Sequence, residues 1–226
     1  MKISCIIPAY NEEKRLGAVL EVVTIHPLID EVVVINDGSK DKTQSIINSF
    51  SNIKIINNLK NSGKSASIYL GIKESTGDYL LFIDADLIGL KIENITALIN
   101  PVKNNLSDVS ISLRINSPWP WRFIGLDYIS GERVLSKKLV EDKLEQIKNL
   151  PGFGLEVFLN SLIIENKQKI AVVRWDNVRS PFKYQKFGIL KGVMGDIKMI
   201  VEIFKVISPL GALKQISNML NLKQAL

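Results

Sequence analysis

The first hundred residues repeat one pattern: a short apolar run, a polar turn, and a segment whose apolar residues recur at helical spacing. Apolar runs of this length are too short for helices and are typical of strands buried between two layers of helices in a parallel sheet. Repeated strand-helix units predict a doubly wound, mostly parallel α/β fold, Rossmann-like in its organisation. The runs lie at 3–7, 31–35, 54–56 and 79–83, and later strands are expected at 108–113 and 171–175.

The composition is that of a chain with a packed core. Of its 226 residues 46% are hydrophobic and 23% are charged, so one large core can form. Cys5 is the only cysteine and lies in an apolar run, which excludes an internal disulfide and favours a reducing compartment. The run that follows Met1 is too short, and too soon broken by Pro8, for a secretory signal. We therefore expect a cytoplasmic location.

The positive charge of the chain is concentrated near its C-terminal end. Residues 167–226 carry 11 Lys/Arg and 3 Asp/Glu, a balance of +8, whereas residues 1–166 carry 18 and 20, a balance of −2. Such asymmetry indicates an anionic partner, for which we expect a lipid phosphate or phospholipid surface and no nucleic acid. Solvated lysines on a surface helix are the alternative. No uncharged run approaches the roughly 18 residues of a membrane-spanning helix.

Two carboxylates, Asp84 and Asp86, follow the apolar run 79–83 directly. In an extended chain both side chains point to the same side, because a single residue separates them. They would repel each other unless a cation or a ligand lay between them. This spacing predicts a divalent metal site.

The turns after the earlier strands are polar as well. Asp37 lies in an Asn-Asp-Gly turn, which is either only a tight turn or part of the ligand site that open α/β sheets form at the carboxyl ends of their strands. Lys64 precedes a predicted helix in Gly-Lys-Ser, but position 58 is Asn, so a phosphate loop of the NTPase type is not expected. Lys64 can still contact a phosphate. His26, in a connection before a proline, is expected to have no catalytic role.

Four motifs together resemble the family-2 glycosyltransferases of the GT-A fold, in the branch that acts on polyprenyl or dolichyl phosphates. The first is Ile-Ile-Pro-Ala-Tyr-Asn-Glu at 6–12, and the second is Asp-Gly-Ser from Asp37 with Asp41 and Thr43. The third is Gly-Lys before a helix at 63–64, and the fourth runs from Gly-Asp-Tyr to Asp-Ala-Asp at 77–86. They occur in family order over about residues 3–90.

The resemblance implies a nucleotide-sugar donor and a divalent cation, Mg²⁺ or Mn²⁺. By motif position Asp37 would contact the base, Lys64 would lie near the nucleotide, Asp84 would lie on the ribose and metal side, and Asp86 would bind the metal. A hard cation held by carboxylates would stabilise the charge that develops on a nucleoside-diphosphate leaving group. The residues that would hold the base and ribose are Pro8, Ala9, Tyr10 and Glu12.

Two residues of the second half are candidates for catalysis. Gly131-Glu132-Arg133 resembles a Gly-x-Arg element of lipid-phosphate members, in which Arg133 would bind a diphosphate or an acceptor phosphate; alternatively, Arg133 is solvated in a helix expected over 132–148. Glu156 lies where many members carry a Glu-Asp pair, but here the residue before it is a leucine. Glu156 is either the general base or a buried structural carboxylate. An acceptor phosphate, already ionised, would need no strong base.

Two further segments have alternative interpretations. The stretch 117–123 is rich in aromatic residues and proline, and forms either core packing or a mobile acceptor loop. From 190 to 207 apolar residues recur at helical spacing with Lys191, Lys198 and Lys205 on the other side. A second piece after Pro209 carries Leu213, Ile216 and Leu220. This pattern is typical of helices that lie on an anionic membrane, and equally of helices packed on their own domain or in a homodimer.

These observations predict one GT-A domain in two halves, with nucleotide-sugar binding in 1–115, acceptor binding in 116–187 and amphipathic helices in 188–226. The expected function is that of an inverting, metal-dependent glycosyltransferase that moves a hexose from a UDP- or GDP-sugar to a lipid-phosphate or other membrane-surface acceptor at the inner face of the membrane. The alternatives are a non-catalytic nucleotide-sugar-binding module and a nucleotidyltransferase, although the latter usually has a glycine-rich, basic loop after its first strand.

Overall fold

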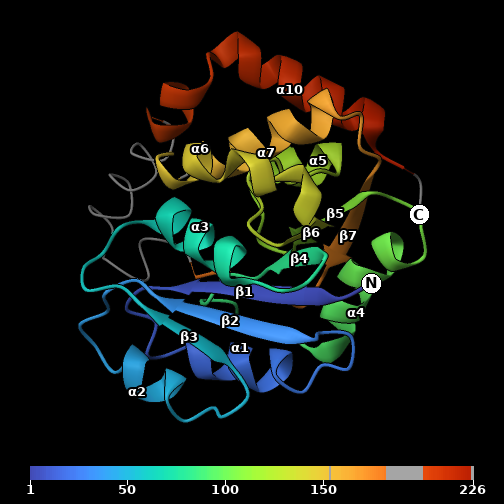
Figure 1. Cartoon of the computed structure of the whole chain (residues 1–226). Helices are drawn as coiled ribbons and strands as arrows, with labels where there is room; N and C mark the ends of the chain where they lie inside the picture. Colours follow the sequence, from blue (N-terminus) through green and yellow to red (C-terminus); the bar gives the residue numbers. More distant parts are fainter. Residues whose placement is uncertain (153, 182–200, 225–226) are drawn as a thin grey trace.

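One seven-stranded sheet runs through the protein (Figure 1). The computed structural model describes residues 1–152, 154–181 and 201–224. The strand order is β3-β2-β1-β4-β6-β5-β7, and β6 alone among these strands is antiparallel to its neighbours. The strands are β1 (Ile3–Ala9), β2 (Glu31–Asn36), β3 (Lys54–Asn57), β4 (Tyr79–Phe82), β5 (Val109–Arg114), β6 (Arg133–Ser136) and β7 (Ile170–Trp175).

Helices cover both faces of the sheet, so the predicted doubly wound α/β fold is confirmed (Figure 1). One face is covered by α1 (Leu16–Val23), α2 (Thr43–Ile47) and α4 (Ile92–Lys103). The other is covered by α3 (Lys64–Glu74), α6 (Leu144–Lys148) and α7 (Gly154–Glu165), with α10 (Pro209–Leu222) outside them. A short helix, α5 (Trp119–Ile124), follows β5.

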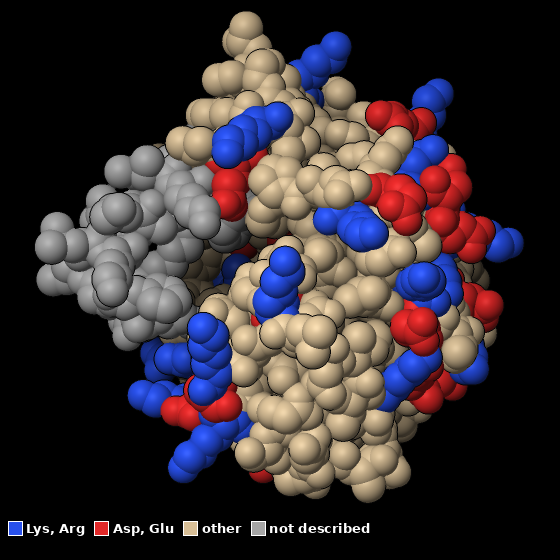
Figure 2. Space-filling view, turned by 60° about the vertical axis from the view of Figure 1, so that its left-hand side comes forward, with Lys and Arg blue, Asp and Glu red and all other residues tan. Residues whose placement is uncertain are grey.

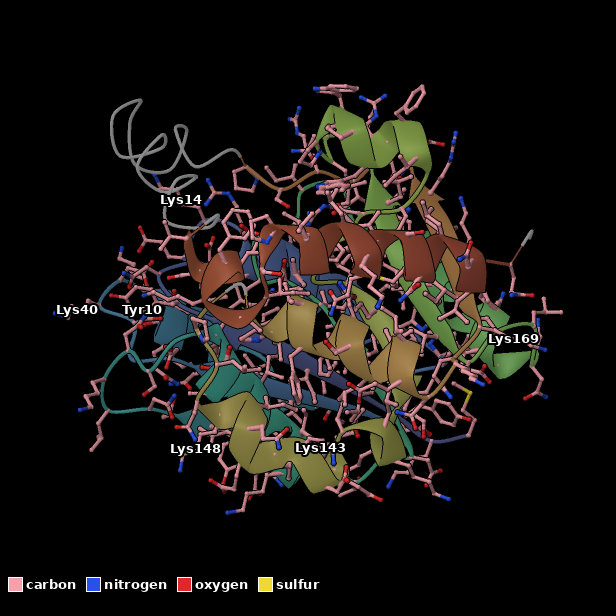
Figure 3. All side chains as sticks on the ribbon, turned by 90° about the horizontal axis from the view of Figure 1, so that it is seen from above. Tyr10, Lys14, Lys40, Lys143, Lys148 and Lys169 are labelled. Carbon is pink, nitrogen blue, oxygen red and sulfur yellow. The ribbon has the colours of Figure 1, made fainter. Side chains whose placement is uncertain are left out.

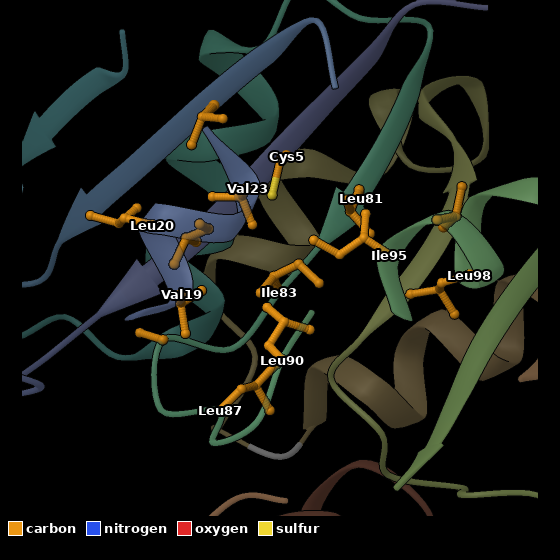
Figure 4. Packing of buried hydrophobic residues seen from close by; sticks show 14 of the residues in the cluster. Cys5, Val19, Leu20, Val23, Leu81, Ile83, Leu87, Leu90, Ile95 and Leu98 are labelled. Carbon is orange, nitrogen blue, oxygen red and sulfur yellow. The ribbon is translucent and has the colours of Figure 1, made fainter. Parts of the chain in front are cut away.

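The core divides between the two faces because side chains alternate along each strand. In β1, Cys5 belongs to the cluster beneath α1 and α4, whereas its neighbour Ile6 belongs to the cluster beneath α3 and α7. Figure 4 shows Cys5 and Leu81 from adjacent strands pointing toward Val23 and Ile95 on the helices. Each of these side chains is at most 1% exposed. Strands with two buried faces thus account for the near-continuous apolar runs of the sequence.

The prediction of a helix over 132–148 is wrong. This segment begins with β6, passes through two turns of 3₁₀ helix at 137–139 and 141–143, and only then forms α6. β6 pairs with β4 on one side, Phe82 opposite Arg133, and with β5 on the other. Pairing with two strands from distant parts of the sequence therefore decides the conformation here.

The C-terminal helix α10 packs on its own domain. Ile216 and Leu220 pack against the cluster that contains α7, and Gln215 Nε2 donates to Ser161 Oγ on α7 at 2.6 Å. Leu213, predicted on the same apolar face, is instead 64% exposed. Residues 201–206 are also helical, whereas the rest of the predicted amphipathic segment, 188–200, lies outside the described residues. Internal packing thus accounts for Ile216 and Leu220 on the apolar face of α10, but not for Leu213.

The division at 115/116 and 187/188 stays a prediction. The sheet continues across the first boundary, since β5 precedes it and β6 and β7 follow it. The second boundary lies outside the described residues. Within the described part of the chain, every helix is too short or too polar to span a bilayer.

His26 lies in the connection between α1 and β2, as predicted, and its ring is buried. Its Nδ1 accepts a hydrogen bond from the Leu28 N–H at 3.2 Å, so the ring is neutral and its Nε2–H donates to the Ile92 carbonyl at 3.2 Å. Burial lowers the pKa of His26 below 6.5, although the bond to Ile92 acts in the opposite direction. The unfolded chain therefore binds more protons just below pH 6.5 than the folded chain does.

We expect the free energy of unfolding to be highest above pH 6.5 and to fall as the pH drops through the lower, folded-state pKa of His26. Thermal unfolding of the unmodified chain should accordingly give a lower Tm at pH 5 than at pH 7. The variant His26→Asn should show a flatter profile in this window, because His26 is the only histidine of the chain. Parallel profiles for the two proteins would contradict the buried, neutral state of His26.

Candidate active site

One cleft at the carboxyl edge of the sheet brings together the residues that were predicted to bind the donor and the metal. The cleft has a volume of about 360 Å³. In Figure 2, which turns the left-hand side of Figure 1 forward, the surface is hollowed beside the residues drawn in grey. The predicted residues that line the cleft are Pro8, Ala9, Tyr10, Glu12, Asp37, Lys64, Asp84 and Asp86. Gly63 and Ala85 of the same motifs also line the cleft, together with Asn61, Ser67 and Gly152, which were not predicted.

The loop after β1 is fixed to the loop after β2. The Glu12 N–H donates to Thr43 Oγ1 at 2.9 Å, and the Glu13 N–H donates to Asp41 Oδ2 at 3.1 Å. Burial alone would raise the pKa of Asp41, but hydrogen bonds from Thr43 and from the Glu13 N–H lower it below its usual value. Asp41 therefore stays ionised and holds the loop that presents Tyr10, which lies near Lys40 in Figure 3.

Asp37 organises the loop that leads into α3. Its carboxylate is 3% exposed, and it accepts hydrogen bonds from the Ser62 N–H at 2.9 Å and the Gly63 N–H at 2.8 Å. Gly38 has a φ of +71°, and a Cβ there would lie 2.6 Å from the Lys60 carbonyl carbon, so the adjacent turn requires glycine. The observed role of Asp37 is thus to hold the loop before α3, and its contact with a nucleotide base stays a prediction.

Lys64, the first residue of α3, lies between two carboxylates. Its Nζ is 2.8 Å from Asp84 Oδ1 and 2.9 Å from Glu156 Oε1. Burial disfavours the charged ammonium, but Asp84 and Glu156 outweigh this effect and raise the pKa of Lys64 above its usual value. A Cβ on Gly131 would lie 2.7 Å from Lys64 Nζ and from Asp84 Oδ2. A side chain at position 131 would therefore displace the ends of Lys64 and Asp84 from their present positions.

Asp84 and Asp86 both line the cleft, but they do not lie in the extended conformation that was expected for them. Strand β4 ends at Phe82, and residues 85 and 86 form a turn rather than a continuation of the strand. Nowhere in the described ranges do three or more His, Cys, Asp or Glu side chains gather as a metal site. Mg²⁺ is commonly held by one or two carboxylates together with substrate phosphates and water. Asp84 and Asp86 fit this second kind of site, in which the protein supplies part of the ligands.

Arg114, at the end of β5, adds a positive charge that the sequence analysis missed. Its Nη1 is 2.7 Å from Glu132 Oε1 and 3.9 Å from Asp84 Oδ2, and its Nη2 is 3.8 Å from Asp127 Oδ2. Burial raises the pKa of Glu132, and the charge of Arg114 opposes this rise. The only signal in the sequence was position, because Arg114 follows a predicted strand as Asp37 and Asp84 do.

Arg133 is fully buried in β6, so the interpretation as a solvated arginine is wrong. Its Nε donates to the Ser130 carbonyl at 2.8 Å, and its Nη1 donates to Asn160 Oδ1 on α7 at 2.6 Å. Arg133 also lines a small cavity of about 10 Å³ next to Lys64 and Glu156. A direct contact with a phosphate stays a prediction, while the observed bonds connect β6 to α7.

Glu156 lies in the first turn of α7 and is 2% exposed. Its Oε1 accepts the hydrogen bond from Lys64, whereas its Oε2 has no hydrogen-bond partner in the part of the chain that the structure describes. A buried carboxylate oxygen without a donor is costly and rare in folded proteins. The alternative interpretation, a buried structural carboxylate with all its hydrogen bonds made, therefore holds for Oε1 but not for Oε2.

The model of glycosyl transferase family 2 matches residues 4–162. A dolichyl-phosphate beta-glucosyltransferase, ALG5D of Trichomonas vaginalis, is 36% identical over 171 residues, which are 70% of this chain and 47% of that protein. A dolichol-phosphate mannosyltransferase of Pyrococcus furiosus is 36% identical over 119 residues, 50% of this chain and 33% of that protein. The chain thus spans less than half the length of these relatives.

A solved structure has the same fold. Glucosyl-3-phosphoglycerate synthase of Mycobacterium tuberculosis, crystallised with Mn²⁺, UDP and glucosyl-3-phosphoglycerate, superposes with a TM-score of 0.70 at 20% identity and covers 91% of this chain and 79% of its own. This likeness confirms the GT-A fold. The names of the relatives confirm the resemblance to the polyprenyl- and dolichyl-phosphate branch. With a family match that covers most of the sheet and its connecting helices, the chain belongs to glycosyl transferase family 2.

Proposed function

We propose that this chain is an inverting, metal-dependent glycosyltransferase that moves a hexose from a UDP- or GDP-sugar to a lipid-phosphate or other membrane-surface acceptor. The observation that carries the proposal is the single cleft that contains all the donor and metal residues of the family motifs. The relatives named as dolichyl-phosphate and dolichol-phosphate transferases support the acceptor class. A peripheral position at the inner face of the membrane, and a homodimer, are parts of the proposal that rest on the sequence alone.

The lining of the cleft combines two kinds of surface, which suit the two parts of a nucleotide sugar. Pro8, Ala9 and Tyr10 supply mostly apolar surface, suited to a base and ribose. Lys64, Asp84 and Asp86 supply charges, suited to a diphosphate and a cation. A divalent cation bound by the two aspartates would stabilise the negative charge that the diphosphate gains as the glycosidic bond breaks. Lys64, whose pKa is raised, keeps a fixed positive charge next to Asp84.

Glu156 is the proposed base for the acceptor. In an inverting transfer the acceptor oxygen attacks the anomeric carbon as the bond to the diphosphate breaks, and a hydroxyl acceptor must lose its proton. The unpartnered Oε2 of Glu156 is free to take this proton, while Lys64 holds Oε1 in place. For an ionised phosphate acceptor, the attacking oxygen has no proton to lose, and Arg114 supplies the nearby positive charge.

Replacing Asp86 should remove the metal-dependent part of donor binding. For the unmodified chain, a UDP- or GDP-sugar at about 100 times its Kd should stabilise by about 2.7 kcal/mol and raise Tm by roughly 5–10 °C when Mn²⁺ is present. Asp86→Asn should keep only the metal-independent shift, because the amide lacks the charge that holds the cation. The exposed Asp142→Asn is the matched control and should behave as the unmodified chain. An intact Mn²⁺ effect in Asp86→Asn would remove this residue as a ligand.

Replacing Glu156 separates catalysis from donor binding. Glu156→Gln should lower kcat by about 10²-fold or more, since general-base catalysis contributes about 10²–10⁴. The KM for the donor should stay nearly unchanged, because the amide oxygen can still accept the hydrogen bond from Lys64. Glu165→Gln, at the exposed end of the same helix, is the control. A kcat within about tenfold of the unmodified chain would contradict the base role and leave Glu156 as the residue that positions Lys64.

A further inference from the structure

The short helix α5 has an inner and an outer face with different uses. Trp121 and Ile124 pack against the core, and the Trp121 ring lies 5.8 Å from the Tyr128 ring. Trp119 and Phe123 point outward and are 77% and 85% exposed. They are four residues apart and therefore lie side by side on the outer face. Core packing, one of the two interpretations of this stretch, thus explains only one of its three aromatic residues, Trp121.

The exposed pair, Trp119 and Phe123, belongs to an anchored element. Before α5, the Ser117 hydroxyl donates to buried Asp127 Oδ2 at 2.6 Å, and Asn116 Nδ2 donates to the Ser180 carbonyl at 2.6 Å. Prolines at 118 and 120 restrict the backbone further. A pair presented this way loses little conformational entropy when a partner covers it. Figure 3 shows α5, in green, at the margin of the molecule.

Arginines gather directly beside the pair. Arg114, Arg122 and Arg174 line a cavity of about 130 Å³, and Asp176 is the one acidic residue among the described residues that line it. Arg122 and Arg174 are exposed, and neither forms an ion pair with any residue in the described ranges. Unpaired guanidinium groups around a cavity favour an anion with several oxygens, such as a phosphate group.

The arginine cavity adjoins the donor cleft. Arg114 belongs to the cavity, and its Nη1 is 3.9 Å from Asp84 Oδ2 in the cleft. The cavity also takes residues from the ends of β5 and β7, which are parallel to β1 and β4 and end at the same edge of the sheet. The exposed pair, the arginines and the cleft therefore lie along the same edge of the sheet, with Arg114 between the cavity and the cleft.

We propose that α5 docks the protein on an anionic lipid surface, with Trp119 and Phe123 inserted among the lipids and Arg122 and Arg174 bound to lipid phosphate groups. The proposal rests on the proposed function, because it brings a membrane-bound acceptor to Arg114 and the cleft. Tryptophan favours the membrane interface, and arginines next to it are attracted by anionic headgroups. A twofold dimer through this patch would place the unpaired arginines of both copies against each other, which disfavours that occupant.

Co-sedimentation of the full chain with vesicles tests the proposal. The unmodified protein should bind vesicles that contain phosphatidylglycerol and bind pure phosphatidylcholine vesicles far less. Trp119→Ser combined with Phe123→Ser should lower binding to the anionic vesicles at least tenfold. Ile25→Ser combined with Leu106→Ser is the matched control, because these apolar residues are 68% and 57% exposed at the opposite edge of the sheet. The thermal shift with a nucleotide sugar and Mn²⁺ should be equal in all three proteins, which keeps this test separate from that of the donor site.

Two further measurements make the outcome specific. Vesicles should shift tryptophan emission to shorter wavelength in the unmodified chain but not in Trp119→Phe, since Trp175 is fully buried and Trp121 is packed on the core. Arg122→Gln with Arg174→Gln should abolish the preference for anionic vesicles. Equal sedimentation of the unmodified and the Trp119/Phe123 variant would overturn the proposal. The proposal would also be overturned if light scattering showed that the Trp119/Phe123 variant changes from dimer to monomer while its vesicle binding stays the same.

Discussion

The two halves of the site depend on a single ammonium group, that of Lys64. It is bound by Asp84 from the end of β4 and by Glu156 from the start of α7, so one side chain connects the donor residues with the proposed base. Removing its charge would leave two carboxylates facing each other in a partly buried place, where repulsion raises the pKa of one of them. The pKa of Lys64 is raised because Asp84 and Glu156 together outweigh the effect of burial on its ammonium group. Donor charge and base are therefore parts of one electrostatic system.

Much of the surrounding structure keeps this ion pair in place. Gly131 leaves the space that the pair occupies, and Arg133 two residues later is bonded to Asn160 on the helix that carries Glu156. The residue between them, Glu132, pairs with Arg114 at the end of β5. Three successive residues that lead into β6 thus serve three different parts of the site: Gly131 leaves space for the ion pair, Glu132 pairs with β5 and Arg133 is bonded to α7. The Gly-x-Arg element acts here through positioning, whether or not Arg133 also contacts a phosphate.

The sequence was sufficient for the parallel part of the fold and for the set of residues that lie together in the cleft. Asp37, Lys64 and Asp84 follow successive strands, and the carboxyl ends of parallel strands meet at one edge, so their proximity follows from order alone. β6 was missed because its four residues become a strand only between β4 and β5, a pairing that no local pattern encodes. The contacts of Arg114 with Glu132 and Asp127 were missed for the same reason, since they depend on where that antiparallel strand enters the sheet.

Periodicity also failed to identify what each apolar face contacts. Ile216 and Leu213 have the same helical pattern in the sequence, yet one packs against the core and the other is exposed. Trp119 and Trp121 are equally apolar, and only the fold separates an outer from an inner face. The charge balance indicated an anionic partner through residues 167–226, but the arginine cavity takes Arg114 and Arg122 from the earlier part of the chain. The site for an anion is therefore a product of strand order, which joins β5 to β7, rather than of local composition.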